Sequence, residues 1–277
     1  MVQKCESIPK VIHYFWFGGK PLPEVVQKCI SSWRKFCPDY EIRRWDESNF
    51  NISICDYVKE AYDAKKWAFV SDYARFYVLN KYGGLYLDTD VKLIKNLDSI
   101  IRRGPFFALE GDNINSLNPG VGMATYPNNP FYCRVLNDYD EDHFIDQLGF
   151  ENRLTVGERV ARFLVDDKTF KINSISKIKD FYIYPQDYFC PLNYFTGELR
   201  ITENTVAVHL YTASWLSKED KRIHKIGQSI SKYLGRKSGE NIEMLLRFPH
   251  SFISRVKKVG FRSTAKYYKE KFYEKFK

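Results

Sequence analysis

Short apolar runs alternate with longer amphipathic segments from residue 10 to residue 91, and this alternation constrains the fold more than any other feature. Residues 10–17 (KVIHYFWF) are β-branched and aromatic and end at a Gly-Gly pair, which predicts a buried strand followed by a loop. From Pro23 onward, apolar side chains recur at steps of three and four residues until Pro38, which predicts a helix.

The same alternation continues toward residue 91. Residues 40–45 (YEIRRW) predict a second strand, and residues 57–82 have helical periodicity that stops at a second Gly-Gly pair. Residues 85–91 (LYLDTDV) predict a further strand, and residues 206–211 (VAVHLY) predict a late one. Strands that alternate with helices at this spacing indicate βαβ units. We therefore expect an α/β fold with a mainly parallel, mixed sheet flanked by helices.

The positive charge lies at the C-terminal end of the chain. The 277 residues carry a net charge of +9, but residues 216–277 hold 17 Lys and Arg against 6 Asp and Glu, a net of +11. Residues 1–215 hold the remaining 26 and 28, a net of −2. A nucleic-acid enzyme would more often carry a basic groove on its body, so we expect no nucleic-acid partner. The shift predicts a domain over residues 1–215 and a basic helical tail over residues 216–277.

Cysteine usage and the N-terminal residues bear on location. The six cysteines form no CxxC pair or regular spacing, which is typical of reduced thiols in the cytosol. The N-terminal residues lack the apolar core of a signal peptide, and no window approaches the length of a membrane span. We therefore expect a cytoplasmic protein.

Two carboxylates, Asp88 and Asp90, follow the apolar run that starts at Leu85. At the end of a strand, this spacing lets both turn toward one hard cation, at the sheet edge where open α/β folds bind ligands. We expect Mn²⁺ or Mg²⁺ there, placed to neutralise a departing nucleoside diphosphate. Asp72 and Arg75 share one face of the preceding helix. The alternative for Asp88 and Asp90 is an acidic pair on the surface without a metal. The alternative for Asp72 and Arg75 is a surface ion pair that contributes little to stability.

These motifs together resemble glycosyltransferase family 32, the sugar-transfer group with a DxD motif that includes yeast outer-chain mannosyltransferases and bacterial capsule enzymes. The clostridial toxin glucosyltransferase domains are more distantly similar. The matching segments are IPKVIHYFWFGG at 8–19, WDESNF at 45–50, AFVSDYARFYVLNKYGGLYLDTDV at 68–91 and HLYTASW at 209–215. The resemblance covers about residues 8–215 and implies a GT-A type, Rossmann-like nucleotide-sugar fold.

Carried over position by position, the resemblance implies roles for six residues. Asp88 and Asp90 would bind the metal, while Asp72 and Arg75 would act as catalytic and donor-binding residues at the donor sugar. Trp16 would stack on the donor base, although a strand Trp is more often buried packing. Tyr86 would line the donor pocket.

The late strand adds three candidates. His209 would complete the metal shell, because imidazole is an acceptable manganese ligand; a lone His on a strand is otherwise a structural residue. Ser214 and Trp215 would reach the diphosphate of the donor from a closing loop.

Three further polar residues are candidates for the acceptor side, namely Glu110, Asp112 and Asn118. Members of the family are expected to retain anomeric configuration, and no nucleophile can be assigned from the sequence. The resemblance implies transfer of a hexose, with a UDP-sugar as the expected donor and a glycan or lipid-linked saccharide as the acceptor, in polysaccharide biosynthesis.

The C-terminal tail interleaves aromatic and aliphatic side chains with Lys and Arg over residues 244–277. This pattern is typical of helices at an anionic bilayer surface, and predicts a peripheral protein at the cytoplasmic face of the bacterial inner membrane. The alternative is a helix packed on the catalytic body.

Two other functions remain as alternatives to a glycosyltransferase. The first is a non-catalytic carbohydrate- or membrane-binding module on a degenerate transferase fold, which would bind donor without turnover. The second is a sugar-nucleotide-forming nucleotidyltransferase, which the single Lys20 of FWFGGKPLP disfavours. The sequence contains no GxGxxG, P-loop or GxSxG motif, which excludes dehydrogenase, kinase and serine-hydrolase sites of those types.

Overall fold

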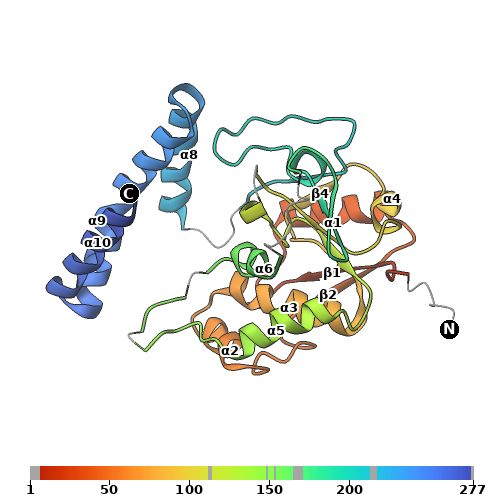
Figure 1. Ribbon diagram of the computed structural model, residues 1–277, viewed down its shortest axis with the longest axis horizontal. Coiled ribbons are helices and arrows are strands. Elements are labelled where there is room, and N and C mark those ends of the chain that lie inside the picture. The colour runs from red at the N-terminus through yellow and green to blue at the C-terminus, as the bar shows by residue number, and fades with distance from the viewer. Residues whose placement is uncertain are drawn as a thin grey trace. The chain divides into compact units, whose positions relative to one another are not determined.

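The computed structural model describes residues 7–111, 114–147, 149–152, 154–164, 171–212 and 217–275 (Figure 1). Contacts divide the chain into two compact units. The first unit comprises Met1–Leu192 and Leu199–Trp215, and the second comprises Asn193–Glu198 and Leu216–Lys277.

The first unit contains a seven-stranded mixed sheet in the order β2-β1-β3-β6-β5-β8-β7. Its strands are β1 (Val11–Phe15), β2 (Glu41–Trp45), β3 (Gly84–Tyr86), β5 (Phe106–Ala108), β6 (Met123–Thr125), β7 (Ser176–Ile178) and β8 (Phe181–Tyr184). β1 pairs in parallel with β2 and β3, and β5 pairs in parallel with β8. The β3–β6, β5–β6 and β7–β8 pairs are antiparallel. The predicted α/β class with a helix-flanked mixed sheet is confirmed.

Helices cover both faces of this sheet. They are α1 (Glu24–Phe36), α2 (Asp56–Asp63), α3 (Trp67–Tyr82), α4 (Asp98–Ile101), α5 (Pro130–Asp140), α6 (Val156–Leu164) and α7 (Gln186–Phe189), with a 3-10 turn η1 at Ile114–Ser116. One buried cluster joins α2, α3, α5 and α6 to the sheet, and another joins α1, α4 and α7 to the opposite face. Because strand side chains alternate, Phe106 faces the second cluster and Phe107 the first.

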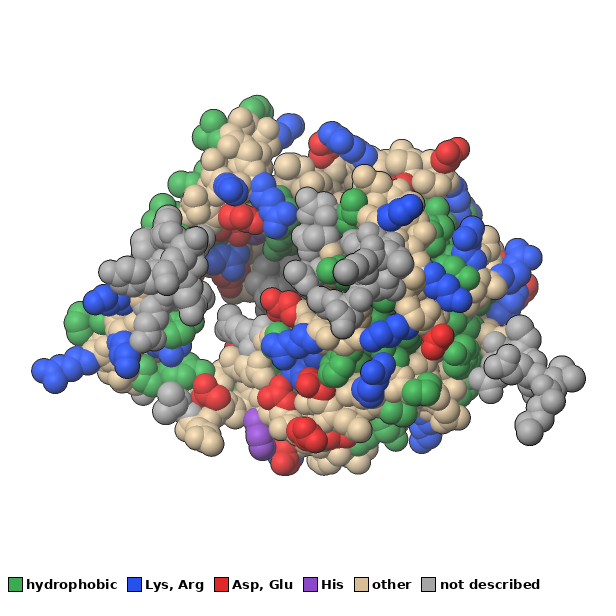
Figure 2. Space-filling model, viewed as in Figure 1, with side chains coloured by type: hydrophobic (Ala, Val, Ile, Leu, Met, Phe, Trp, Pro, Cys, Tyr) green, Lys and Arg blue, Asp and Glu red, His purple; other side chains and the backbone are tan. Residues whose placement is uncertain are grey.

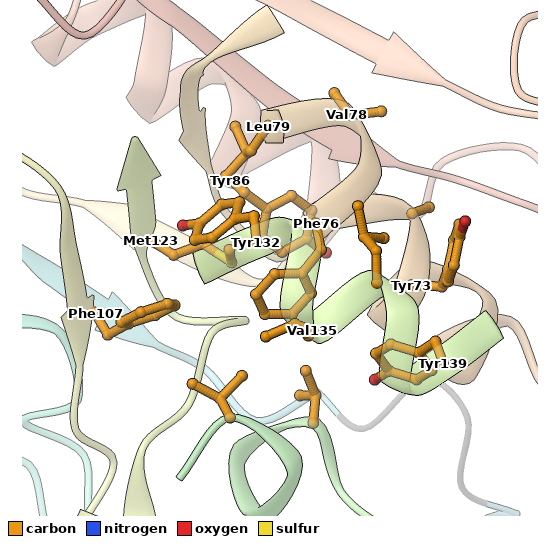
Figure 3. Packing of buried hydrophobic residues seen from close by; sticks show 14 of the residues in the cluster. Tyr73, Phe76, Val78, Leu79, Tyr86, Phe107, Met123, Tyr132, Val135 and Tyr139 are labelled. Carbon is orange, nitrogen blue, oxygen red and sulfur yellow. The ribbon is translucent and has the colours of Figure 1, made fainter. Parts of the chain in front are cut away.

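The aromatic core between α3, α5 and the sheet is shown in Figure 3. Phe76 meets Tyr132 edge to face at 5.1 Å between ring centroids, and Tyr73 meets Tyr139 in the same manner at 5.8 Å. Such pairs add roughly 0.5–1.5 kcal/mol each beyond the burial of their area. This packing fixes α3, the helix that carries Asp72 and Arg75.

The strand predicted over residues 85–91 is wrong in its length. The chain leaves the main sheet after Tyr86, turns through residues 88–90, and resumes as β4 (Val91–Leu93). β4 pairs antiparallel with β9 (Ala207–His209) in a separate two-stranded sheet. The pattern of apolar residues is continuous across the break because Leu85, Leu87 and Val91 are all buried, so periodicity alone gave no sign of the turn.

The second unit contains three helices, α8 (Lys218–Leu234), α9 (Arg236–Val259) and α10 (Phe261–Lys275). Gly235 and Gly260 separate them with φ values of 83° and 80°, backbone conformations that glycine adopts without steric cost. Among the described residues, no helix of either unit combines the length and apolarity that crossing a bilayer requires.

Candidate metal and donor site

The two carboxylates of the DxD motif lie in the turn between the two sheets. Two consecutive glycines allow the chain to pass from the end of α3 into the strand that leads to this turn. Gly83 ends α3 with a φ of 66°, and Gly84 begins β3 with a φ of 102°. A Cβ on Gly84 would stand 2.7 Å from the carbonyl O of Val11, so only glycine allows β3 to approach β1 this closely. The strand then ends two residues before Asp88.

His209 joins Asp88 and Asp90, although it lies far along the chain. One ligand atom from each of these three residues lies within 4.8 Å of the others. The β4–β9 ladder explains the meeting, because Val91 pairs with His209 and the amide N of Leu210 donates to the carbonyl O of Asp90 at 3.0 Å. The predicted grouping is therefore present in the structure.

Asp90 is held tightly by its neighbours. Its Oδ2 accepts hydrogen bonds from the amide N and the Oγ1 of Thr212, both at 2.9 Å, and its Oδ1 lies 3.3 Å from Nε2 of His209. Burial raises the pKa of this carboxyl, but His209 and the Thr212 donors outweigh burial and hold the pKa at about 2. For His209, burial lowers the pKa and Asp90 raises it, with the net result well above 6.5. Asp90 is therefore a carboxylate at neutral pH.

Asp88 is oriented from three sides. The hydroxyl of Tyr86 donates to its Oδ1 at 2.5 Å, and a guanidinium nitrogen of Arg75 lies 3.5 Å from the same oxygen. Its amide N donates to the carbonyl O of Gly120 at 2.7 Å. A Cβ on Gly120 would stand 2.1 Å from Oδ2 of Asp88, so the carboxylate packs directly on this glycine. These contacts leave Asp88 little rotational freedom.

Asp72 and Arg75 form an ion pair on α3, next to Asp88 of the DxD turn. Their side chains meet at 2.9 Å between Oδ1 and Nη2, and both residues are buried, with 9% and 4% of their surface exposed. The guanidinium carbon lies 4.6 Å from the ring centroid of Tyr86. Burial raises the pKa of Asp72 to about 6, while Arg75 lowers it and Asp88 raises it further. The surface-ion-pair alternative for these two residues is therefore wrong.

Two acceptor-side candidates connect to the same turn. The side chain of Asn118 donates to Oε2 of Glu110 and accepts from the amide N of Gly120 at 2.8 Å. Because Gly120 packs on Asp88, Glu110 and Asn118 lie in one continuous polar network with the DxD turn. The third candidate, Asp112, lies outside the described residues.

Trp16 directly follows β1, at the same edge of the sheet at which the parallel strand β3 ends before the DxD turn. Its ring is partly exposed, and its Nε1 donates to the carbonyl O of Lys20 at 2.6 Å, which closes the FWFGG loop. The amide N of Gly18 donates to Oε1 of Glu47 at 2.6 Å. Ser214 and Trp215 lie outside the described residues, so their predicted contact with the diphosphate stays a prediction.

Sequence reasoning missed Thr212. It is the third residue after His209 in the segment HLYT, and only the β4–β9 pairing brings it to Asp90. Tyr86 was expected to line the donor pocket, whereas it is 2% exposed and its hydroxyl contacts Asp88. No signal in the sequence separates a tyrosine that supports a carboxylate from one that lines a pocket.

The chain is similar to known glycosyltransferases. Residues 2–131 match the family described as capsular polysaccharide synthesis protein. An uncharacterized glycosyltransferase of Acanthamoeba polyphaga mimivirus is 28% identical over 204 residues, which cover 66% of this chain and 77% of the viral protein. Inositol phosphoceramide mannosyltransferase 3 of Schizosaccharomyces pombe is 35% identical over 103 residues, which cover 34% of this chain and 28% of the yeast enzyme.

A solved structure, the PaToxG glycosyltransferase, has a TM-score of 0.39 and 21% identity over 48% of this chain and 60% of its own. The matched stretch spans less than half of each fission-yeast mannosyltransferase. The family match and the similarity in sequence to the viral and fission-yeast proteins confirm the resemblance to sugar-transfer enzymes. Over residues 2–131, just under half of its length, the chain is similar to the capsular polysaccharide synthesis protein family, and it is related to glycosyltransferases.

Proposed function

We propose that this protein transfers a hexose from a nucleotide-sugar donor to a glycan or lipid-linked saccharide, with a divalent cation held by Asp88, Asp90 and His209. The observation that carries the proposal is the convergence of these three side chains within 4.8 Å from two separate parts of the chain. Two carboxylates and one neutral imidazole form a donor set that suits Mn²⁺, so a cation bound there would displace the proton that Asp90 favours on His209. Mg²⁺ would accept the carboxylates equally well. A bound cation supplies Lewis-acid neutralisation for a diphosphate leaving group.

The residues of the chain prepare this site before a donor arrives. Thr212 keeps Asp90 ionised and fixed, and Tyr86 fixes one oxygen of Asp88. Preorganised charges of this kind lose little energy to reorientation during the reaction. Asp90 enters the cation site as a carboxylate at neutral pH, because its pKa is about 2.

Arg75 adds a positive charge beside the cation site. Asp72 forms an ion pair with the guanidinium of Arg75, and the ring of Tyr86 packs against the flat face of the guanidinium. These two contacts hold the positive charge close to Asp88. We propose that Arg75 contacts the diphosphate side of the donor and that Asp72 contacts the donor sugar. Trp16, partly exposed at the end of β1, is proposed to stack on the base.

The donor class is tested with a panel of UDP-hexoses and nucleoside diphosphate mannose. A UDP-sugar is the expected donor, and the names of the yeast relatives make a mannosyl donor the second to test. Slow hydrolysis of the correct donor releases a nucleoside diphosphate even without the true acceptor. The anomeric configuration of the released sugar, followed by NMR, tests the expected retention.

The same assay tests the metal site through substitution. Asp90→Asn and Asp88→Asn each remove a charged ligand without changing side-chain volume, so diphosphate release in Mn²⁺ should fall by about a hundredfold or more. Asp39→Asn is the matched control, because this carboxylate is 76% exposed. Donor binding without turnover in the wild-type protein, across the whole panel, would replace the proposal with a binding module.

A further inference from the structure

The helices α8 and α9 pack against each other through small and polar residues rather than apolar ones. Gly227, Ser231 and Gly239 lie at the crossing. A Cβ on Gly239 would stand 2.4 Å from the carbonyl O of Gly227, so glycine is required for this close approach. Small residues at a crossing let two helix backbones come together without large side chains between them.

A polar network extends the same contact along the two helices. Nδ1 of His224 lies 2.9 Å from Oε1 of Glu243, and Arg247 bridges Asp220 at 3.1 Å and Glu243 at 3.4 Å. These residues lie on α8 and α9 in antiparallel register, with Asp220 and His224 facing Arg247 and Glu243. The interior of the hairpin formed by α8 and α9 is therefore polar.

The large apolar side chains of this hairpin lie on its outside. Of the side chains described between residues 217 and 275, only Gly227, Ser231, Gly239 and Thr264 belong to buried residues. The exposed apolar side chains of α8 and α9 are Phe248 (43%), which contacts Tyr268 of α10, and six others: Ile226 (40%), Tyr233 (80%), Leu234 (71%), Leu245 (61%), Leu246 (45%) and Ile253 (55%). We call these six residues the hairpin face. An arrangement with polar groups inside and apolar groups outside is the reverse of a water-soluble helical pair.

Helical periodicity places the hairpin face on one side. At 100° per residue, the mean direction of the exposed apolar side chains on α8 and on α9 is turned by about 100–120° from the face that packs on the other helix, in the same rotational sense, with single side chains between about 50° and 160°. In an antiparallel pair, two such stripes emerge on the same side. On α9, α10 packs through Phe252 with Phe261 and through Ser251 with Tyr268. Leu245 shares the side of Phe252 by helical periodicity, but it stays 61% exposed, and Leu246 and Ile253 stay 45% and 55% exposed. α10 therefore does not cover the hairpin face.

Charge identifies the occupant of this face. Arg222, Lys225 and Lys232 are exposed on α8, with Arg222 next to the apolar stripe and the two lysines about 100° around the helix from Ile226 and Tyr233. We call these three side chains the basic border. The segment 216–277 carries a net charge of +11. A second copy of the chain would bring two surfaces of like charge together, which opposes association. An anionic bilayer surface offers both an apolar layer for the stripes and negative headgroups for the basic border. Figure 2 shows hydrophobic and basic side chains together on the surface of these helices.

We propose that the hairpin face docks on the surface of an anionic lipid bilayer, with the aliphatic side chains in the headgroup region and the basic side chains against lipid phosphates. This inference does not depend on the proposed sugar transfer, because none of its residues belongs to the metal and donor site.

The chain of 277 residues is tested by co-sedimentation with vesicles of phosphatidylcholine alone or mixed with phosphatidylglycerol. Binding is expected only to the anionic vesicles, and it should weaken as salt screens the basic border. The variant Leu245→Glu/Ile253→Glu places two acidic groups in the hairpin face, and should weaken vesicle binding by at least about tenfold.

A matched control separates the effect of the position in the hairpin face from the effect of adding two glutamates. Leu199→Glu/Ile201→Glu makes the same replacements at apolar side chains that are 50% and 57% exposed outside the hairpin. This control should bind vesicles as the wild-type protein does. Because all four side chains are exposed, both variants should keep the wild-type circular dichroism spectrum and thermal midpoint.

Three outcomes would overturn the proposal. Equal loss of binding in both double variants would show that added negative charge alone is responsible. Unchanged binding of Leu245→Glu/Ile253→Glu would remove the apolar face from the interaction. A dimer that this variant dissociates, with no vesicle binding by the wild type, would assign the face to a second copy. Arg222→Gln/Lys225→Gln, which leaves the apolar stripe intact, tests the basic border independently and should reduce anionic binding alone.

Discussion

The imidazole of His13 is buried in the middle of β1, and both of its ring nitrogens are hydrogen-bonded. An indole N–H can only donate, so Nδ1 of His13 accepts from Nε1 of Trp45 at 3.0 Å. Nε2 therefore carries the proton and donates to the carbonyl O of Gly83, also at 3.0 Å. The ring thus links β1 to β2 and to the glycine turn that leads into the DxD strand. A second proton on Nδ1 would face the indole N–H, so the folded state keeps the ring neutral.

Burial is the largest influence on this ring and lowers the pKa of His13 from 6.5 to about 4; the Gly83 carbonyl opposes it and Arg43 assists it. The folded state has the lower pKa, so the unfolded chain takes up this proton first as pH falls. The stabilisation is complete above pH 6.5 and is lost as pH falls toward 4. The difference between the two pKa values corresponds to about 3 kcal/mol of unfolding free energy.

Urea unfolding of the wild type and of His13→Gln, measured from pH 7 to pH 4, tests this value. The difference in unfolding free energy between the two proteins should shrink by about 3 kcal/mol over that range, because other titrating groups are common to both. His143→Gln is the control, in which the pH dependence of the unfolding free energy should have the opposite sign. This exposed ring lies 2.8 Å from Glu60, which raises its pKa, so its small contribution is present at low pH and lost as pH rises. A difference for His13→Gln that stays constant with pH would refute the argument.

Two further predictions concern the cation site. Gly120→Ala places a Cβ 2.1 Å from Oδ2 of Asp88 and should weaken Mn²⁺ activation by about tenfold or more, measured by Mn²⁺ titration of diphosphate release. The control is Gly122→Ala, whose Cβ would press on the ring of Phe189. This control should lower only the unfolding free energy, by roughly 1–3 kcal/mol. Unchanged Mn²⁺ dependence in Gly120→Ala would contradict the packing of Asp88 on this glycine. Thr212→Val removes one hydrogen bond to Asp90 at constant shape, and should raise the Mn²⁺ concentration for half-maximal activity by about tenfold. Full activity at unchanged Mn²⁺ would show that the Thr212 hydroxyl does not orient Asp90.

Much of the first unit follows from local sequence. The β-branched and aromatic run at 10–17, the proline-bounded helix after it and the Gly83-Gly84 stop all predicted elements that the structure contains. These signals are local because backbone conformation depends on neighbouring residues: the positive φ of Gly83 is available to glycine wherever the chain folds. The α/β class and the grouping of Asp88 with Asp90 were predictable for this reason.

The turn at Asp88–Asp90 was not predictable, because apolar periodicity continues through it. The break arises when β4 leaves the main sheet to pair with β9, a strand from the other end of the unit. That pairing also brings Thr212 to Asp90, and it turns a plausible ligand, His209, into a neighbour of both carboxylates. Partners that are distant in the chain leave no mark in local periodicity.

In the C-terminal helices, what the sequence determines can be distinguished from what the tertiary structure determines. The sequence by itself determined that residues 216–277 are basic and helical with apolar stripes, because charge and periodicity are properties of the residues. Only the tertiary structure decided which faces meet: Gly227 and Gly239 permit a close crossing that polar side chains fill, and this leaves the apolar stripes outside. Amphipathic periodicity states which residues share a face, whereas burial of that face depends on what packs against it.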